Sequence, residues 1–122
     1  MSEACQPFSE EELGREISRS EERMNRRQLH LWEAIRIPPA KWQLHPWGDE
    51  GGGFWVVGII GRSVIWYNDI EEGFNRSSYT TSGVIDEYWC NQDELEWTLN
   101  HLLEELDGGS DGHRLGPPEP IA

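Results

Sequence analysis

The longest apolar stretch of the chain, FWVVGIIGRSVIWYND at residues 54–69, does not alternate between hydrophobic and polar positions. It contains two runs of strand-forming residues, 54–60 and 63–68, which are joined at Gly61-Arg62. Glycine at the first position of a two-residue loop is typical of a type II′ β-hairpin. Because a strand with one face in water should alternate, the pattern predicts a central hairpin that is buried on both faces.

Both faces of this hairpin are hydrophobic, and each needs a cover. Strict period-two alternation places Trp55, Val57 and Ile59 on one face and Phe54, Val56 and Ile60 on the other. Helices over one face would form a core, but monomers rarely leave a second large apolar patch in water. Three arrangements could bury the second face. The helices could lie on opposite faces, or at opposite ends, of a coiled sheet. Alternatively, the second face could associate with a second copy of the chain, or a partner or ligand could occupy it.

Two helical patterns flank the hairpin. Ser9 and Glu12 form a capping box that opens the first helix, which Pro38-Pro39 ends. Asn91, with Glu94 three residues on, is the candidate N-cap of the last helix. The helical period of the apolar positions predicts one packed side for each helix. The stripes are Leu13, Ile17, Met24, Leu31, Trp32 and Ile35 in the first helix, and Leu95, Leu99, Leu102, Leu103 and Leu106 in the last.

Three further segments have weaker strand patterns. Residues 41–47 (KWQLHPW) read as an edge strand because Pro46 cannot donate a ladder hydrogen bond. Residues 74–79 (FNRSSY) and 84–89 (VIDEYW), joined by TTSG, read as a second hairpin. The chain is therefore predicted to be α+β: an antiparallel meander sheet of four to five strands, flanked by an N-terminal and a C-terminal helix. We expect one domain over residues 9–106, with disordered tails at 1–8 and 107–122.

The charge of the chain is strongly negative and unevenly spread. Ten Lys and Arg residues stand against 23 Asp and Glu residues, for a net charge of −13. Residues 1–36 account for −2 of this charge and residues 37–122 for −11. Such a body should repel nucleic acid and anionic membrane surfaces and favour a basic protein partner, although solubility alone also explains it.

The chain has no apolar run near the ~20 residues that span a bilayer, and its N-terminus lacks a signal-peptide pattern. Its two cysteines, Cys5 and Cys90, make a poor disulfide framework. We therefore expect a cytoplasmic protein.

Candidate catalytic and metal-binding patterns are weak. Asp69, Glu71 and Glu72 share one turn, but the D-x-D-x-D-G spacing of a calcium loop is absent, so solvated acids explain them better. The glycines at 51–53 lack the spacing of a phosphate loop. Cys90 is expected to be a small buried thiol rather than a nucleophile. We predict no cofactor and no metal site.

Trp97 points away from the leucine stripe of the last helix, on a side that it shares with Asp93 and Glu104. Either another element covers it, or it is an exposed tryptophan beside carboxylates, which is typical of an interface. The leading hypothesis is a non-catalytic protein-binding module, immunity-like or adaptor-like, with an acidic, tryptophan-rich surface that holds a basic partner. The expected contact residues are Trp97, Trp66, Trp55, Asp93, Asp69, Glu71 and Tyr67.

Two alternatives belong to other functional classes. A small-ligand-binding protein or enzyme would hold its ligand in an aromatic pocket between sheet and helix, with Tyr67, Asn68, Asp69 and either Cys90 or His101 as the polar groups. A structural homodimer would instead form through the second sheet face.

Overall fold

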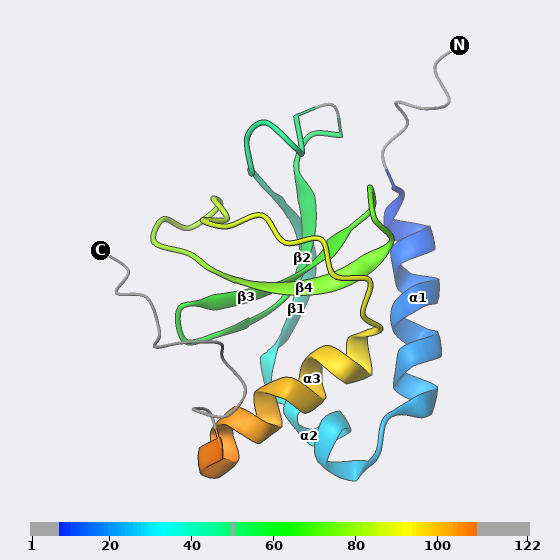
Figure 1. The fold of residues 1–122 in the computed structure, drawn as a ribbon. Helices are drawn as coiled ribbons and strands as arrows, with labels where there is room; N and C mark the ends of the chain where they lie inside the picture. Colours follow the sequence, from blue (N-terminus) through cyan, green and yellow to red (C-terminus); the bar gives the residue numbers. More distant parts are fainter. Residues whose placement is uncertain (1–7, 50, 110–122) are drawn as a thin grey trace.

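The computed structural model describes residues 8–49 and 51–109. It confirms the predicted α+β class: four antiparallel strands form a meander in the order β1-β2-β3-β4, flanked by helices from both ends of the chain (Figure 1). The elements are α1 (Glu10–Arg23), α2 (Arg26–Ile35), β1 (Arg36–Trp42), β2 (Phe54–Ile60), β3 (Ser63–Asn68), β4 (Gly73–Ser78), α3 (Leu95–Glu104) and a short π-helical segment η2 (Glu105–Gly109).

The predicted N-terminal helix is two helices. Ser9 caps α1 as expected, with a complete capping box to Glu12. A second complete capping box, from Asn25 to Gln28, opens α2, and Met24 between the helices is extended. The prediction of one continuous helix was therefore wrong, because the Asn25 side chain offers the backbone an alternative to continuing α1.

The first strand begins earlier than its sequence pattern suggests. β1 follows α2 directly at Arg36 and ends at Trp42, so it includes Pro38 and Pro39 and excludes residues 43–47 of the predicted strand. Its edge position in the sheet is confirmed. The pairing with β2 shifts register between Arg36 and Ala40, where the two prolines lack backbone donors.

A bulge in β2 changes which side chains share a face. Val56 pairs with Trp66 and Gly58 with Ile65, so Val57 is the extra residue. Beyond the bulge the alternation reverses, and strict alternation therefore assigned two residues to the wrong faces. Ile59 packs with the cluster of Val56, and Ile60 packs with that of Val57.

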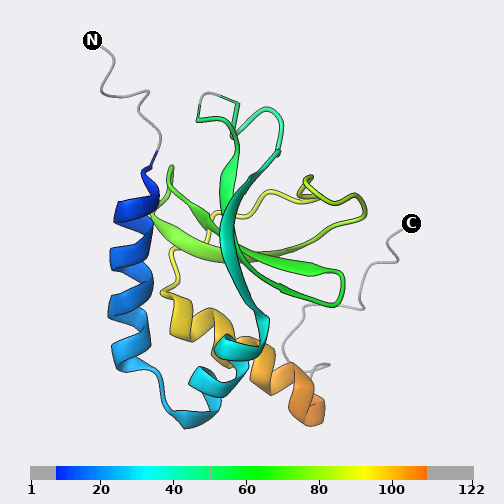
Figure 2. The same ribbon diagram turned by 180° about the vertical axis from the view of Figure 1, so that it is seen from behind.

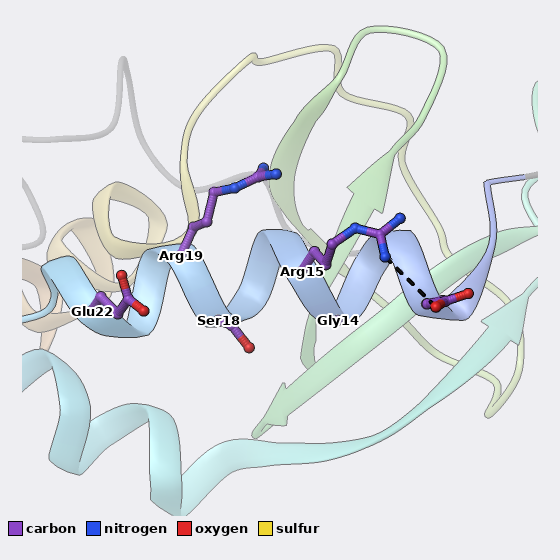
Figure 3. Close-up of a pocket in the computed structure, with 6 residues that line it drawn as sticks. Gly14, Arg15, Ser18, Arg19 and Glu22 are labelled. Atoms are coloured by element: carbon purple, nitrogen blue, oxygen red, sulfur yellow. Dashed lines mark ion pairs between the residues drawn. The ribbon is translucent and has the colours of Figure 1, made fainter.

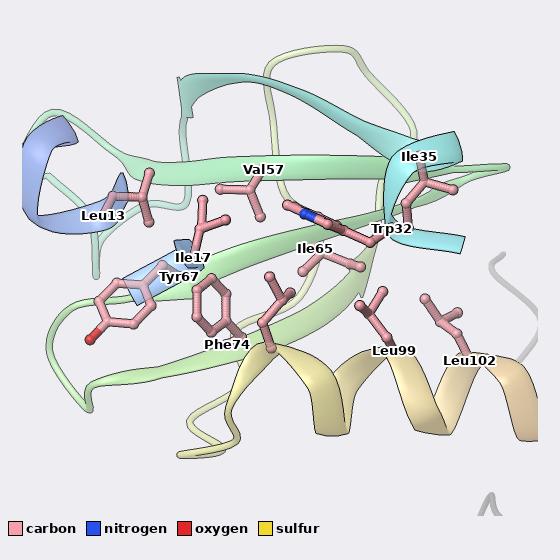
Figure 4. Close-up of a cluster of buried hydrophobic side chains, with 11 residues drawn as sticks. Leu13, Ile17, Trp32, Ile35, Val57, Ile65, Tyr67, Phe74, Leu99 and Leu102 are labelled. Atoms are coloured by element: carbon pink, nitrogen blue, oxygen red, sulfur yellow. The ribbon is translucent and has the colours of Figure 1, made fainter. Parts of the chain in front are cut away.

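All three α-helices cover the same face of the sheet (Figures 2 and 4). Side chains from every one of them join the first hydrophobic cluster, which fills the space between helices and sheet. Its buried members are Leu13, Ile17, Trp32, Ile35, Val57, Ile65, Tyr67, Phe74, Leu95, Leu99 and Leu102.

The second face is covered by segments that are neither helix nor regular strand. Residues 79–94, called here the connector, cross this face in front of the sheet in Figure 1. Together with residues 43–53 they close a second cluster: Trp42, Leu44, Phe54, Val56, Val64, Trp66 and Ile85, with Tyr79 and Tyr88 half-buried against it. The predicted second hairpin is therefore wrong in its second strand, and the face expected for self-association is occupied by the chain itself.

The predicted tails lie mostly outside the described residues. Phe8, which the sequence assigned to the N-terminal tail, stacks on Tyr67 with ring centroids 4.7 Å apart. At the other end, α3 leads directly into η2, which includes Asp107. The ordered part of the domain therefore extends beyond residues 9–106 at both ends.

Candidate functional site

Two buried asparagines hold the connector against the sheet. The Asn68 amide nitrogen donates to the Trp89 carbonyl at 2.9 Å. The Asn75 side-chain amide makes two hydrogen bonds to the backbone of Asn91. The amide nitrogen of Asn75 donates to the Asn91 carbonyl at 3.1 Å, and the amide oxygen of Asn75 accepts from the Asn91 N–H at 2.9 Å. The predicted N-cap role of Asn91 was wrong: Glu94 is the N-cap, and α3 begins three residues later than expected, at Leu95.

The connector approaches β4 so closely that only glycine fits at Gly73. A Cβ atom there would lie 2.3 Å from the Gln92 Cα and 2.4 Å from the Asn91 carbonyl oxygen. Farther along β4, the Ser77 hydroxyl accepts from the Trp66 indole N–H at 2.9 Å and donates to the Glu87 carbonyl at 2.8 Å. The backbone of the connector is therefore anchored at several points by side chains of β3 and β4.

An aromatic column runs from the second cluster to the surface. Trp66 is fully buried, and its ring centroid lies 6.1 Å from that of Tyr88. Tyr88 in turn stacks on Trp47, with centroids 4.5 Å apart and planes 12° from parallel. Trp47 is 47% exposed, and Trp89, next along the connector, is 48% exposed. Aromatic side chains that are partly buried and partly exposed to solvent are common in binding surfaces.

Three segments meet over the second face, and they contain no lysine or arginine. We call residues 43–53, 68–73 and 79–94 together the acidic cover. The first and third are joined by backbone hydrogen bonds from Gln43 to Gly83 and from Ile85 to Gln43, and the second and third by Asn68. The described residues of the cover include eight acidic ones: Asp49, Asp69, Glu71, Glu72, Asp86, Glu87, Asp93 and Glu94.

On the helical side of the molecule, most arginines pair with carboxylates of the same chain. Each arginine–carboxylate ion pair among the described residues includes at least one residue of a helix, of η2 or of a helix cap. The Arg23 guanidinium donates to Glu96 at 2.6 Å, and the carboxyl of Glu96 is buried. Burial alone would raise the pKa of Glu96, but the hydrogen bonds from Arg23 and Ser20 outweigh it and lower that pKa below its usual value.

Carboxylates also converge near the end of β3. Tyr67 is almost fully buried, and in Figure 4 its hydroxyl points away from the first cluster. Burial raises the pKa of Tyr67 to about 12, and the negative charges of Glu16, Glu72 and Asp69 add to this shift. Carboxylates of α1 and of the β3–β4 turn therefore lie near the Tyr67 hydroxyl.

The seven predicted contact residues do not lie together on one surface. Asp69, Glu71 and Asp93 belong to the acidic cover, whereas Trp66 is buried beneath it. Trp97 is 55% exposed on the outer side of α3, as the leucine stripe indicated.

Trp55 and Tyr67 lie on the helical face, in or against the first cluster. The Trp55 indole N–H donates to the Phe8 carbonyl at 2.7 Å, and the Lys41 ammonium lies 5.0 Å from its ring centroid. The sequence analysis did not select Trp47, Trp89 or Glu87 as contact residues. The three segments of the acidic cover contain no lysine or arginine, and that signal could have directed attention to them.

The residues of the predicted ligand pocket are not gathered into one. The first cluster fills the space between sheet and helices, and the Asn68 amide is committed to the backbone. Cys90 is exposed rather than buried, because the connector backbone is held on both sides of it and its side chain projects outward. His101 lies on the exposed side of α3. Among residues 8–49 and 51–109, no three His, Cys, Asp or Glu side chains are placed to share a metal ion.

The outer side of α1 has a shallow surface pocket of its own (Figure 3). Its walls come from one helix face, where Arg15 pairs with Glu11 at 3.7 Å and Arg19 with Glu16 at 2.8 Å. The small residues Gly14 and Ser18 make the depression, and both of its arginines already have carboxylate partners. This pocket therefore offers no unpaired arginine for an anionic ligand.

Comparisons with protein-family models, with curated proteins and with solved structures found no match for this chain. Within the part of the chain that the structure describes, no helix is long and apolar enough to cross a membrane.

Proposed function

We propose that this chain is a non-catalytic protein-binding module that holds a basic partner protein on its acidic cover. The observation that supports this proposal best is the segregation of charge. On the helical side, arginines are matched with carboxylates within the molecule. On the cover, carboxylates gather without arginine or lysine from their own segments.

Most carboxylates of the cover are available to a partner. Within the described residues Asp69, Glu71, Glu72, Asp86, Glu87 and Asp93 make no ion pair. Asp49 is paired only with the exposed side chain of His45, and Glu94 lies 3.6 Å from Arg23 at the margin of the cover. Lys41 is close enough to Asp69 to feel its charge, but its ammonium is bound to the carbonyls of Gly51 and Gly53.

The cover also exposes apolar side chains. Six large hydrophobic residues are exposed in the described part of the chain, and four of them lie on the cover: Trp47, Ile70, Val84 and Trp89. Tryptophan is enriched among residues that contribute most to protein–protein affinity, and it is most effective where surrounding contacts exclude water. A negative field with exposed tryptophans would attract a basic partner quickly and then hold it by apolar contact.

Affinity capture with matched charge variants tests this proposal. The double variant Glu71→Gln/Glu72→Gln removes two charges from the cover, and Glu22→Gln/Glu33→Gln removes two exposed charges from the helical side. A lysate of the source cells is passed over each immobilised protein and over wild type, and retained proteins are identified by mass spectrometry.

We expect a basic protein that wild type and the helical variant retain equally, that the cover variant retains several-fold less, and that moderate salt releases. Retention of the same proteins in equal amounts by all three columns, or release that does not depend on salt, would overturn the proposed function.

A further inference from the structure

Trp89 and Glu87 form a fixed pair on the surface of the connector. The Trp89 indole N–H donates to Glu87 Oε1 at 3.3 Å, and the same oxygen accepts from the Ser78 backbone N–H at 3.1 Å. The main chain of both residues is anchored from below, because Asn68 binds the Trp89 carbonyl and Ser77 binds the Glu87 carbonyl. The pair is therefore exposed but already ordered, which lowers the entropic cost of binding a ligand.

The same chemical pair occurs elsewhere in this molecule with a third group bound to it. The Trp32 indole N–H donates to Glu21 Oε2 at 2.8 Å. Arg36 donates to the same carboxylate oxygen at 2.6 Å, and its guanidinium carbon lies 5.0 Å from the centroid of the Trp32 ring. One arginine thus satisfies the carboxylate and covers the indole face in a single position.

An arginine can do both because its guanidinium is planar. It stacks on an aromatic face while it donates hydrogen bonds to a carboxylate, whereas the ammonium of lysine is a compact, strongly hydrated charge. At Trp89 and Glu87 the indole and the carboxylate are present, but no cation from the described residues lies over the ring. The acidic cover has no lysine or arginine to supply one.

We propose that Trp89 and Glu87 form a preorganised seat for an arginine side chain of the basic partner. This inference rests on the proposed function and names the chemistry by which the partner is recognised. The incoming guanidinium stacks on the exposed face of the Trp89 indole and donates to Glu87 Oε2. That oxygen makes no hydrogen bond within the described residues, whereas Oε1 is already occupied by the indole and by Ser78.

Nona-arginine and nona-lysine peptides, which carry equal charge, are the probes that test the seat. Each is titrated into the full-length ¹⁵N-labelled protein at low salt, and the indole N–H resonances are followed by NMR. The variants are Glu87→Gln, which keeps an oxygen to accept from the indole, and Trp89→Leu. Their matched controls are Glu33→Gln, an exposed carboxylate of α2, and Trp97→Leu, an exposed tryptophan of α3.

We expect the Trp89 indole resonance to shift with nona-arginine and the dissociation constant to rise about fivefold or more in Glu87→Gln and in Trp89→Leu. The two control variants should change it less than about twofold, and nona-lysine should bind more weakly than nona-arginine. All four exchanged side chains are exposed, and an unchanged amide spectrum elsewhere verifies that each variant is folded.

If nona-arginine bound wild type, Glu87→Gln and Trp89→Leu with equal affinity, the proposal that Trp89 and Glu87 bind an arginine would be wrong. If Glu71→Gln/Glu72→Gln still weakened binding in that case, the proposed function would stand without it. If wild type bound both peptides with equal affinity and the Trp89 indole resonance did not shift, the proposed arginine site would also be wrong, because charge alone would then account for binding. Failure of both peptides to bind wild type at low salt would contradict both proposals.

Discussion

The two faces of this sheet are covered in different ways. The helical cover consists of regular elements with capping boxes in α1 and α2, and most of its arginines are paired with carboxylates of the chain. The acidic cover consists of irregular segments that are held by amide and hydroxyl side chains from β3 and β4. Both exclude water from a tryptophan-containing cluster, so burial alone does not distinguish them. The difference lies in what each presents outward: carboxylates interspersed with arginines on one side, and carboxylates without arginine or lysine in their own segments, beside exposed tryptophans, on the other.

The indole N–H of the buried tryptophan is satisfied on both faces of the sheet. Trp32 is fully buried on the helical side, and its indole N–H donates to Glu21. Trp66 is fully buried on the other side, and its indole N–H donates to Ser77. Both faces therefore bury a tryptophan whose indole N–H is hydrogen-bonded, by Glu21 of α1 on one face and by β4 of the sheet itself on the other.

The largest effect is expected when either buried tryptophan is truncated. Trp66→Ala and Trp32→Ala should each lower the free energy of unfolding by about 3–5 kcal/mol, because both remove a fully buried ring and leave a cavity. Urea denaturation measures the two losses. A loss below about 1 kcal/mol for Trp66→Ala would show that the acidic cover does not enclose a core equivalent to the helical one.

A smaller effect should separate the two modes of attachment. Asn75→Ala removes both hydrogen bonds to the Asn91 backbone and should cost about 1–3 kcal/mol. Amide hydrogen exchange should accelerate in the connector while the helices keep their protection. The matched control, Asn100→Ala in α3, should be nearly neutral, since alanine favours a helix. Equal loss of protection in helices and connector would mean that the connector is not a separately held element.

The same contrast explains what could be read from the sequence. Consecutive apolar residues in 54–68 revealed a ribbon buried on both sides, and turn residues located the hairpin at Gly61 correctly. The break at Asn25 was readable, because Asn25 and Gln28 have the spacing of a capping box. The bulge at Val57 was not, because the residues around it are all apolar or glycine and any register would bury them.

The candidate site was harder to predict than the fold. Asn68 and Asn75 both fall in predicted strands, and only their long-range bonds to Trp89 and Asn91 show that they hold the connector. Trp66 and Trp89 are both tryptophans in strand-like segments, yet one is buried and the other half exposed. Whether each of these tryptophans is buried depends on whether another segment of the chain lies over it. That is a property of the tertiary structure, and local sequence patterns do not contain it.

A pH titration should detect the burial of the Tyr67 phenol on the helical face, to which the carboxylates near the β3–β4 turn add a smaller effect. The pKa of Tyr67 is raised to about 12 in the folded chain, against about 10 for an unperturbed tyrosine. The unfolded state therefore loses this proton first, and the stability that the protonated phenol provides is complete below pH 10 and lost as pH rises towards 12. Wild type should lose about 1–2 kcal/mol more than Tyr67→Phe over this range in urea denaturation. Parallel curves for the two proteins would mean that the Tyr67 pKa is not raised.

The most direct test of the account compares the potential over the two covers without any partner. Cationic and anionic nitroxides of similar size are added separately at low salt, and the paramagnetic relaxation of backbone amides is measured by NMR. We predict that the cationic probe relaxes amides of residues 86–93 several-fold more than the anionic probe, whereas amides of residues 14–23 respond to the two probes much more equally. The same ratio of the two probes over both regions would contradict the segregation of charge from which the proposed function is argued.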